Sequence, residues 1–306
     1  MVSPDRFVQL ARWALWLNVA IVITGASVRL TGSGLGCSDW PNCEEDRFVA
    51  SLEYHAIIEF GNRLFTGAVG IAVILAVLGS LRRVPRDREL VAWAAGLVVG
   101  VIAQAVLGAF VVRSELAPQT TMAHFLLSMV LLWNATVLVD KARQSGDEHR
   151  DAPTFVSRQA FDRARRTRLL TRATAAWCGL LLVTGTIVTG AGPHSGSDDP
   201  EVAARLPFLV RDVTRIHSVT ALGGLGLALL VVRHAHVAGF VAVREHAMRV
   251  VTLLAAQAAL GYWQYFTGVP VLLVGIHITL ACVIWIQVVR LALVARDRRA
   301  HATVTV

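Results

Sequence analysis

Residues 270–294 read PVLLVGIHITLACVIWIQVVRLALV. This stretch is almost continuously apolar, and its length is close to the roughly 20 residues with which a helix crosses the hydrocarbon of a bilayer. Apolar and polar residues do not alternate along it, which favours a membrane-spanning helix over a strand of a membrane barrel. The sequence therefore predicts an all-α polytopic membrane protein with eight transmembrane helices. The seven other apolar stretches lie at 8–29, 53–81, 91–112, 119–139, 169–189, 208–232 and 248–268.

The composition agrees with a chain built largely from membrane-spanning helices. Of the 306 residues, 55% are hydrophobic and 16% are charged, whereas a soluble domain carries about 25% charged residues. These values exclude a disordered chain and an ordinary cytosolic enzyme. The formal net charge of +8 is compatible with nucleic-acid binding, but in a membrane protein the basic residues gather in cytoplasmic loops. We therefore expect no nucleic-acid partner.

Charged residues of opposite sign gather on opposite sides of the predicted spans. Acidic residues are concentrated in loops 30–52 and 190–212. The positive-inside rule therefore places both termini in the cytoplasm. Arg accounts for every basic residue except Lys141, which is typical of a GC-rich genome and leads us to expect a bacterial plasma membrane. The segments that hold most of the basic residues are 1–12, 82–90, 140–172, 233–249 and 290–299.

The two halves of the chain repeat one another. Residues 104–108 read QAVLG and residues 257–261 read QAALG, and His124 and His277 are separated by the same interval as these two segments. Further pairs correspond in the same order along the halves: Thr24-Gly25 with Thr184-Gly185, and Gly32 with Gly190.

Four spans per half is an even number, so the two copies have the same orientation in the membrane. They are then related by a pseudo-twofold axis along the membrane normal. Each copy is predicted to form a four-helix bundle, the first over residues 1–140 and the second over residues 169–306. Residues 141–168 are predicted to be a cytoplasmic linker between them.

One histidine begins each even-numbered span: His55, His124, His217 and His277. Even spans start on the outer side, and at 1.5 Å of rise per residue His124 and His277 lie roughly 10 Å below their loops. A single buried histidine is best explained by a hydrogen bond to a neighbouring helix, but four favour a ligand role, because polar groups at this depth usually face the bundle interior. Two imidazoles per bundle suit the axial positions of a haem iron, whereas zinc usually takes three or four protein ligands.

The second span also carries Glu59, Asn62 and Arg63, which share one helical face with His55. In one interpretation, Glu59 and Arg63 form an i,i+4 ion pair that neutralises both charges in lipid. In the other, Glu59 is an acid–base group beside a cofactor. The spacing of these residues favours neither interpretation of Glu59.

Arg215 lies two positions before His217 and also has two interpretations. Its guanidinium group is suited to bind a haem propionate in a bidentate manner. Alternatively, it marks the end of a span and extends to the membrane surface.

The four cysteines fall into two groups. Cys178 and Cys282 lie inside spans and are predicted to be small apolar packing residues. Cys37 and Cys43 lie in the outer loop, in an oxidising compartment. We predict that they form a disulfide in the resting protein, which is either structural or a thiol pair that cycles with a substrate or partner.

Residues 28–43 read VRLTGSGLGCSDWPNC, and this segment resembles the first outer loop of the haem A synthase family. Residues 59–63 read EFGNR and resemble the Glu-x-x-His-Arg motif of that family. The histidines that begin spans 4, 6 and 8 match as well. The resemblance covers essentially the whole chain.

The resemblance implies a membrane enzyme that oxidises the C8 methyl group of haem O to a formyl group, with water as the oxygen donor. Haem b would be held by His217 and His277, and the substrate haem would lie near His124 and Glu59, with Arg63 and Arg215 as further haem-binding candidates. The implied partners are a farnesyltransferase that makes haem O and the assembly of a terminal oxidase, which uses haem A. A homo-oligomer is compatible with the sequence, which leaves the oligomeric state open.

This chain departs from the family pattern at two places. Asn62 stands where the motif has histidine, and asparagine is a poor iron ligand. Either His55 supplies the second ligand of the substrate haem, which we prefer, or His124 is its only protein ligand. In addition, loop 190–212 lacks the second cysteine pair of some members.

Two rival functions are consistent with a repeated, histidine-bearing bundle. A dihaem b-type electron carrier would need no catalytic group, but Glu59 and Asn62 are not reproduced around His217. A transporter with a degenerate repeat would bind no haem.

Overall fold

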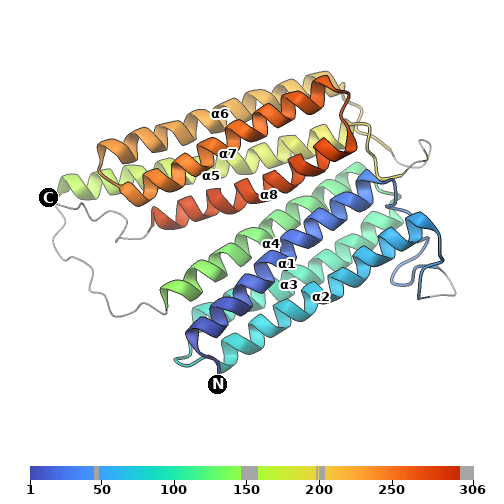
Figure 1. Ribbon diagram of the computed structural model, residues 1–306, viewed down its shortest axis with the longest axis horizontal. Helices are drawn as coiled ribbons and strands as arrows, with labels where there is room; N and C mark the ends of the chain where they lie inside the picture. Colours follow the sequence, from blue (N-terminus) through green and yellow to red (C-terminus); the bar gives the residue numbers. More distant parts are fainter. Residues whose placement is uncertain (45–47, 146–157, 198, 200–203, 297–306) are drawn as a thin grey trace.

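The computed structural model describes residues 1–44, 48–145, 158–197, 199 and 204–296. Within these ranges the secondary structure is helical apart from isolated β-bridges (Figure 1). The all-α fold is thereby confirmed. The helices are α1 (Pro4–Leu30), α2 (Tyr54–Arg82), α3 (Arg88–Arg113), α4 (Pro118–Gln144), α5 (Arg158–Ala191), α6 (Val210–Val237), α7 (Val241–Phe266) and α8 (Val271–Val294).

Seven of these helices are long and apolar enough to cross a membrane, which confirms a polytopic membrane protein. The exception is α7, which has the required length but a more polar outer part. Gln257, Tyr262, Gln264 and Tyr265 lie there and lower its mean hydropathy.

Several helices extend beyond the predicted spans, because polar residues continue or cap them outside the hydrocarbon. The Ser3 hydroxyl accepts a hydrogen bond from the Arg6 amide at the start of α1. The difference is largest in the predicted linker at 141–168, where α4 continues to Gln144 and α5 begins at Arg158. The first turns of α5 are rich in Arg and Ala, which are good helix formers in water. Residues 146–157 of the linker lie outside the described part.

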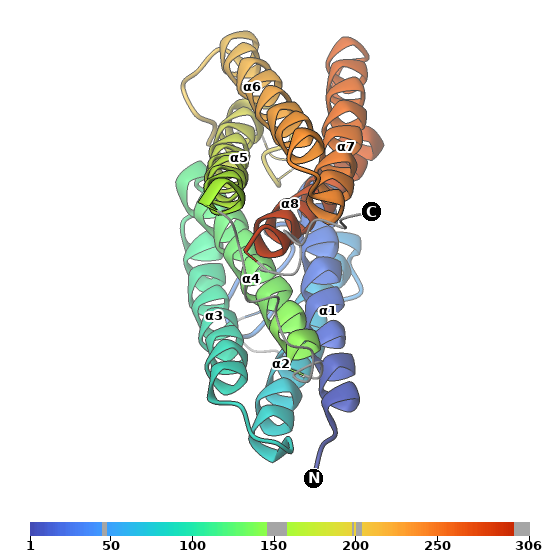
Figure 2. The same ribbon diagram turned by 90° about the vertical axis from the view of Figure 1, so that its left-hand side faces the viewer.

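The helices form two groups of four, as Figures 1 and 2 show from two directions. In the first group, α1 and α3 each pack against both α2 and α4. In the second, α5 and α7 each pack against both α6 and α8. Each repeat is therefore a closed ring of four helices.

The contacts between the two bundles follow the symmetry of the repeat. Helix α4 contacts its counterpart α8, and the α1–α8 contact has its counterpart in α5–α4. This is the pattern of an isologous interface around a twofold axis. The indole Nε1 of Trp285 on α8 donates to the carbonyl of Met129 on α4 at 2.8 Å, which joins the bundles near the middle of these helices.

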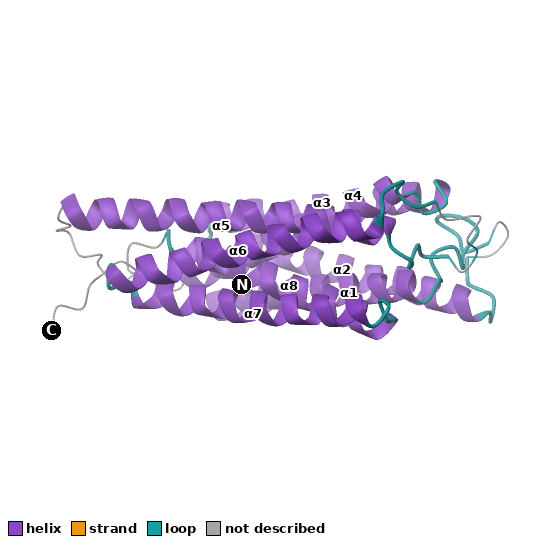
Figure 3. Ribbon diagram, turned by 90° about the horizontal axis from the view of Figure 1, so that it is seen from above, coloured by secondary structure: helices purple, strands orange, loops and turns teal. Residues whose placement is uncertain are grey.

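The outer loops gather at one end of the molecule and connect the two bundles (Figure 3). The Gly34 amide donates to the Gly196 carbonyl at 2.8 Å. Arg29, at the end of α1, donates from Nε to the His194 carbonyl at 2.8 Å and from Nη2 to the Thr189 carbonyl at 3.1 Å. The two halves are thus joined at this end by a backbone hydrogen bond between the loops and by the side chain of Arg29.

Candidate functional site

The second bundle carries His217 in the first half of α6 and His277 in the first half of α8. The hydroxyl of Thr184 on α5 lies 3.0 Å from His217 Nδ1 and donates its proton to the Leu181 carbonyl, also at 3.0 Å. A hydroxyl that donates to the Leu181 carbonyl accepts from Nδ1–H of His217, and this is the tautomer of His217 suited to a metal ligand. The Nε2 atom of His217 then keeps the lone pair that binds a metal.

His124 and His277 are held in the same way in their respective bundles. The amide Nε2 of Gln104 donates to the His124 carbonyl, and that of Gln257 donates to the His277 carbonyl, each at 3.0 Å. Each glutamine comes from the helix that precedes the histidine and begins the repeated QA-x-LG segment. The two histidines therefore occupy equivalent positions on α4 and α8.

Glycines lie directly against three of these imidazole rings. A Cβ atom added at Gly108 would stand 3.6 Å from His124 Cε1, one at Gly261 3.2 Å from His277 Cε1, and one at Gly185 3.1 Å from His217 Cε1. The missing side chains allow the rings to pack against the neighbouring helix backbone. By contrast, Gly223 and Gly224 accommodate the Trp177 indole and serve helix packing.

Asn62 occupies in the first bundle the position that His217 occupies in the second. The Thr24 hydroxyl on α1 donates to Asn62 Oδ1 at 2.8 Å. This contact corresponds to that between Thr184 and His217, because Thr24 and Thr184 are repeat-related. The two bundles thus share a threonine contact at this position but place asparagine in one and histidine in the other.

His55 lies at the outer end of α2, against the loop. Its Nδ1 atom is 2.9 Å from the Ser33 hydroxyl, and its ring makes an edge contact with Tyr54. A Cβ atom at Gly36 would come within 2.3 Å of the His55 carbonyl group, so only glycine fits there. His55 and Asn62 are separated by about 10 Å along the helix axis.

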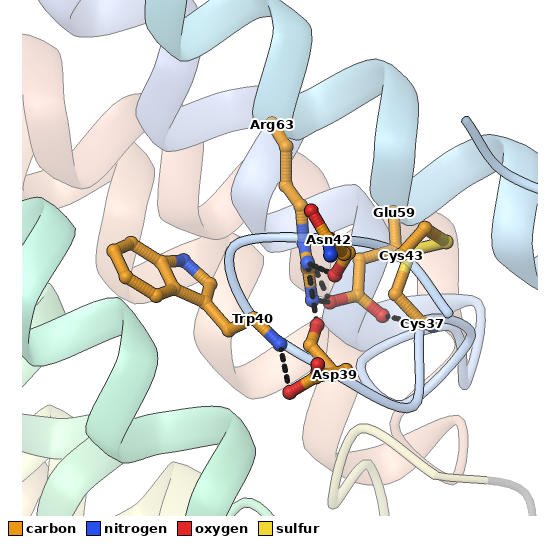
Figure 4. A network of polar contacts seen from close by, with 7 residues as sticks. All are labelled: Cys37, Asp39, Trp40, Asn42, Cys43, Glu59 and Arg63. Carbon is orange, nitrogen blue, oxygen red and sulfur yellow. Dashed lines mark hydrogen bonds and ion pairs between the residues drawn. A yellow bond between two sulfur atoms is a disulfide. The ribbon is translucent and has the colours of Figure 1, made fainter. Parts of the chain in front are cut away.

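Glu59 is buried and holds the outer loop onto α2 (Figure 4). Its Oε2 atom accepts from the Cys37 amide at 2.8 Å, and its Oε1 atom accepts from Arg63 Nε at 3.2 Å and from Nη2 at 2.5 Å. The predicted Glu59–Arg63 ion pair is therefore present. It does not exclude a chemical role, because a buried carboxylate next to a cofactor also needs its charge balanced.

Arg63 extends this network to the disulfide-closed part of the loop (Figure 4). Its Nη1 atom donates to the Asp39 and Asn42 carbonyls at 2.8 Å and 2.9 Å. Cys37 and Cys43 are bonded to each other and fully buried, which confirms the predicted disulfide. Glu59 and Arg63 thus hold both sides of the ring that the disulfide closes.

The residues of the second bundle fit a haem with two axial histidines. The Nδ1 atom of His277 is buried without a hydrogen-bond partner within the described residues, as is that of His124. Histidine imidazoles are common axial ligands of haem iron. In the first bundle, only His124 occupies a corresponding position.

Comparison with known proteins gives the family. Residues 9–289 match the family model COX15-CtaA, which is described as cytochrome oxidase assembly protein. The chain belongs to this family. A protein of Bacillus cereus (strain 03BB102) named "Heme A synthase" is 25% identical over 285 residues, which cover 89% of this chain and 88% of the relative. A protein of the same name from Alkalihalophilus pseudofirmus is 31% identical over 134 residues, which cover 44% of this chain and 45% of that relative.

Membership of the COX15-CtaA family confirms the resemblance stated for residues 28–43 and 59–63. It leaves the roles of all the candidate site residues as predictions: His55, Glu59, Arg63, His124, Arg215, His217 and His277. Arg215 is largely exposed and lies 3.8 Å from Asp212, an arrangement compatible with either interpretation of this residue.

Sequence reasoning did not identify the residues that position the histidines in this COX15-CtaA protein. Gln104 and Gln257 were recognised only as markers of the repeat, and Thr184 only as the counterpart of Thr24. The sequence did contain a signal for these residues, because a polar residue inside an apolar span needs a hydrogen-bond partner. The identity of that partner depends on the packing of the helices.

Proposed function

We propose that the protein is a haem A synthase, which oxidises the C8 methyl group of haem O to a formyl group and so makes haem A for terminal oxidases. The observation that carries this proposal is the difference between two otherwise equivalent bundles. One has His217 beside Thr184, and the other has Asn62 beside Thr24 with Glu59 one turn away. Two sites for electron transfer alone would need no such difference.

The second bundle is the proposed site of a resident haem b with His217 and His277 as axial ligands. Thr184 keeps His217 in the tautomer that binds iron, and Gln257 fixes the backbone of His277. Bound there, a haem b supplies reversible one-electron chemistry. Hydrogen bonds from residues outside the ligand set commonly orient metal-binding histidines, and the contacts of Thr184 and Gln257 are proposed to act in this way.

The first bundle is the proposed substrate site, with His124 as ligand of the haem O iron. In the reaction, the methyl group and one water become a formyl group, and four protons and four electrons leave to an acceptor. Glu59 is the proposed acid–base group, since its Oε2 atom faces the loop and is held by the Cys37 amide. Arg63 balances its charge.

The identity of the second ligand in the first bundle has two candidate answers. His55 stays a prediction, but its Nδ1 atom is engaged with Ser33 and it lies about two turns from the position equivalent to His217. The geometry favours the alternative, in which Asn62 leaves one face of the substrate iron without a protein ligand. Such a site would release its product haem more easily. We expect His55→Ala to retain haem A formation within a few-fold of wild type.

The proposed setting is a bacterial plasma membrane with both termini in the cytoplasm, as the basic loops indicate. The proposed partners are the farnesyltransferase that supplies haem O and the terminal oxidase under assembly. In this orientation, both proposed haem sites lie towards the outer side of the membrane. The compartment there is oxidising, so the disulfide is stable.

Pigment extraction tests the proposed function against the rivals. Cells that make haem O, with and without this protein, are extracted and their haems separated by chromatography. Haem A that appears only with the protein supports the synthase. A purified protein that contains haem b but never yields haem A would support the dihaem electron carrier, and a colourless protein would support the transporter.

Thr184→Val is expected to weaken haem b binding about tenfold, since losing a hydrogen bond to a metal-binding histidine typically costs 10–100-fold in affinity. The repeat provides a matched control, because Thr24→Val removes the equivalent hydroxyl next to Asn62. Haem b content after a wash with apomyoglobin measures the effect. Equal losses in both variants would show that the hydroxyl acts on the stability of α1 or α5 and not on His217.

Cys37→Ala is expected to lower haem A formation several-fold without loss of the bundles. The disulfide closes the loop segment that Arg63 holds through two carbonyls, so its loss loosens the contacts of Glu59. Haem b content and the thermal midpoint measure the integrity of the bundles. A non-reducing mass map with both thiols free in wild type would contradict the disulfide.

A further inference from the structure

The interface between the two bundles opens into a pocket at the end of the molecule opposite the disulfide loop. It lies where α1 begins and where α4 and α8 end, and it has a volume of about 100 Å³. None of the histidines discussed above lines it. Three arginines line it, one from each helix: Arg12, Arg143 and Arg290.

The three arginines outnumber Asp140, the one carboxylate among the lining residues of this pocket. Arg12 and Arg290 both repel Arg143, and Asp140 is the carboxylate that attracts it. Asp140 also accepts a hydrogen bond from Gln144 at 2.6 Å. Three like charges from both halves of the chain converge on one pocket, so the site is suited to an anion.

The other walls of the pocket indicate that this anion belongs to a lipid. Leu15, Val139 and Ile286 contribute apolar side chains to the lining, and Trp16 also lines the pocket with 57% of its surface exposed. Tryptophan is enriched at the boundary between hydrocarbon and headgroups. The pocket therefore lies where a phosphate group would meet the acyl region of the inner leaflet.

A polar atom in the same pocket lacks a partner among the described residues. The Oε1 atom of Gln287 is buried without a hydrogen bond, and Gln287 is one of the lining residues. A buried amide oxygen requires a donor, which a phosphate oxygen is not. A headgroup that carries both a phosphodiester and a free hydroxyl would satisfy the arginines and Gln287 together.

We propose that this pocket binds the headgroup of an anionic phospholipid of the inner leaflet, with Arg12, Arg143 and Arg290 on the phosphodiester and Gln287 on a headgroup hydroxyl. Basic pockets between transmembrane helices on the cytoplasmic side bind anionic lipids by this chemistry. Because α1 and α4 belong to one bundle and α8 to the other, the lipid would bridge the two halves at the end where no disulfide loop connects them.

Native mass spectrometry of the delipidated full-length protein tests the proposal with phosphatidylglycerol as the probe. We expect one tightly bound phosphatidylglycerol in wild type and much weaker binding of phosphatidylcholine, whose phosphate is neutralised by its own headgroup. Arg12→Gln/Arg143→Gln/Arg290→Gln is expected to weaken phosphatidylglycerol binding about 100-fold, and each single variant about fivefold. The single variants keep the test informative if the triple variant does not fold.

The matched control removes the same charge from the same side of the protein. Arg82, Arg86 and Arg88 lie around the α2–α3 loop, are exposed and do not line the pocket. Arg82→Gln/Arg86→Gln/Arg88→Gln is expected to bind phosphatidylglycerol as wild type does. Equal losses in the two triple variants would overturn the proposal in favour of a general charge effect, and displacement by equimolar inorganic phosphate would overturn it in favour of a free-anion site.

Discussion

Replacing either His217 or His277 by alanine is expected to abolish the low-spin b-type spectrum of the purified protein. Each substitution removes one of the two axial bonds proposed for haem b, and the other histidines on the described helices of the second bundle, His234, His236 and His246, lie near the end of α6 and the start of α7. The reduced-minus-oxidised absorption spectrum and the haem b content per chain measure the result. We expect the loss to be nearly complete, since the remaining histidine would have to hold the haem alone.

Two further histidine variants serve as controls for these spectra. His124→Ala changes the equivalent position of the first bundle, so it should retain the b-type signal in full. His236→Ala, in the last turn of α6 away from the pair, should also be neutral. A normal spectrum with two axial histidines in both His217→Ala and His277→Ala would show that the pairing in the second bundle is wrong.

Glu59→Ala is expected to retain haem b and bound haem O but to lose haem A formation by at least about 100-fold. Acid–base groups contribute typically 10²–10⁴-fold to the rate of a reaction. Iron ligation does not involve the carboxylate, so haem binding should persist. Product haems are quantified by chromatography after a fixed time with haem O.

The structural role of Glu59 requires a second variant, because this carboxylate also holds the outer loop. Glu59→Gln keeps an amide oxygen that accepts from Cys37 N–H but removes the charge and the basicity. If Glu59→Gln makes haem A at nearly the wild-type rate, Glu59 only positions the loop. If it is as inactive as Glu59→Ala while the disulfide stays intact, the acid–base role is supported.

The membrane fold could be predicted from the sequence because one physical requirement dominates it. A span must be apolar over the thickness of the hydrocarbon, and residues 270–294 satisfy this without ambiguity. The repeat then implied two bundles, since QAVLG and QAALG occur in corresponding spans. The ends of the helices were less predictable, because α5 continues in water from Arg158 through residues that carry no hydropathy signal.

The candidate site could be predicted only in part. The four histidines, Glu59 and the disulfide were identified because their residue types are unusual inside or beside a span. The partners were not, because they depend on how helices rotate against each other. Thr184 bonds His217 from another helix, and Arg29 reaches the opposite half of the molecule. The threonine contact that Asn62 and His217 share likewise became evident only from the structure.

The central claim is that the first bundle performs the chemistry and the second holds a resident haem. The most direct test is the haem content and haem A yield of purified His124→Ala, supplied with haem O. We predict a normal amount of haem b, no retained haem O and no haem A. A His124→Ala protein that forms haem A at the wild-type rate would contradict the account.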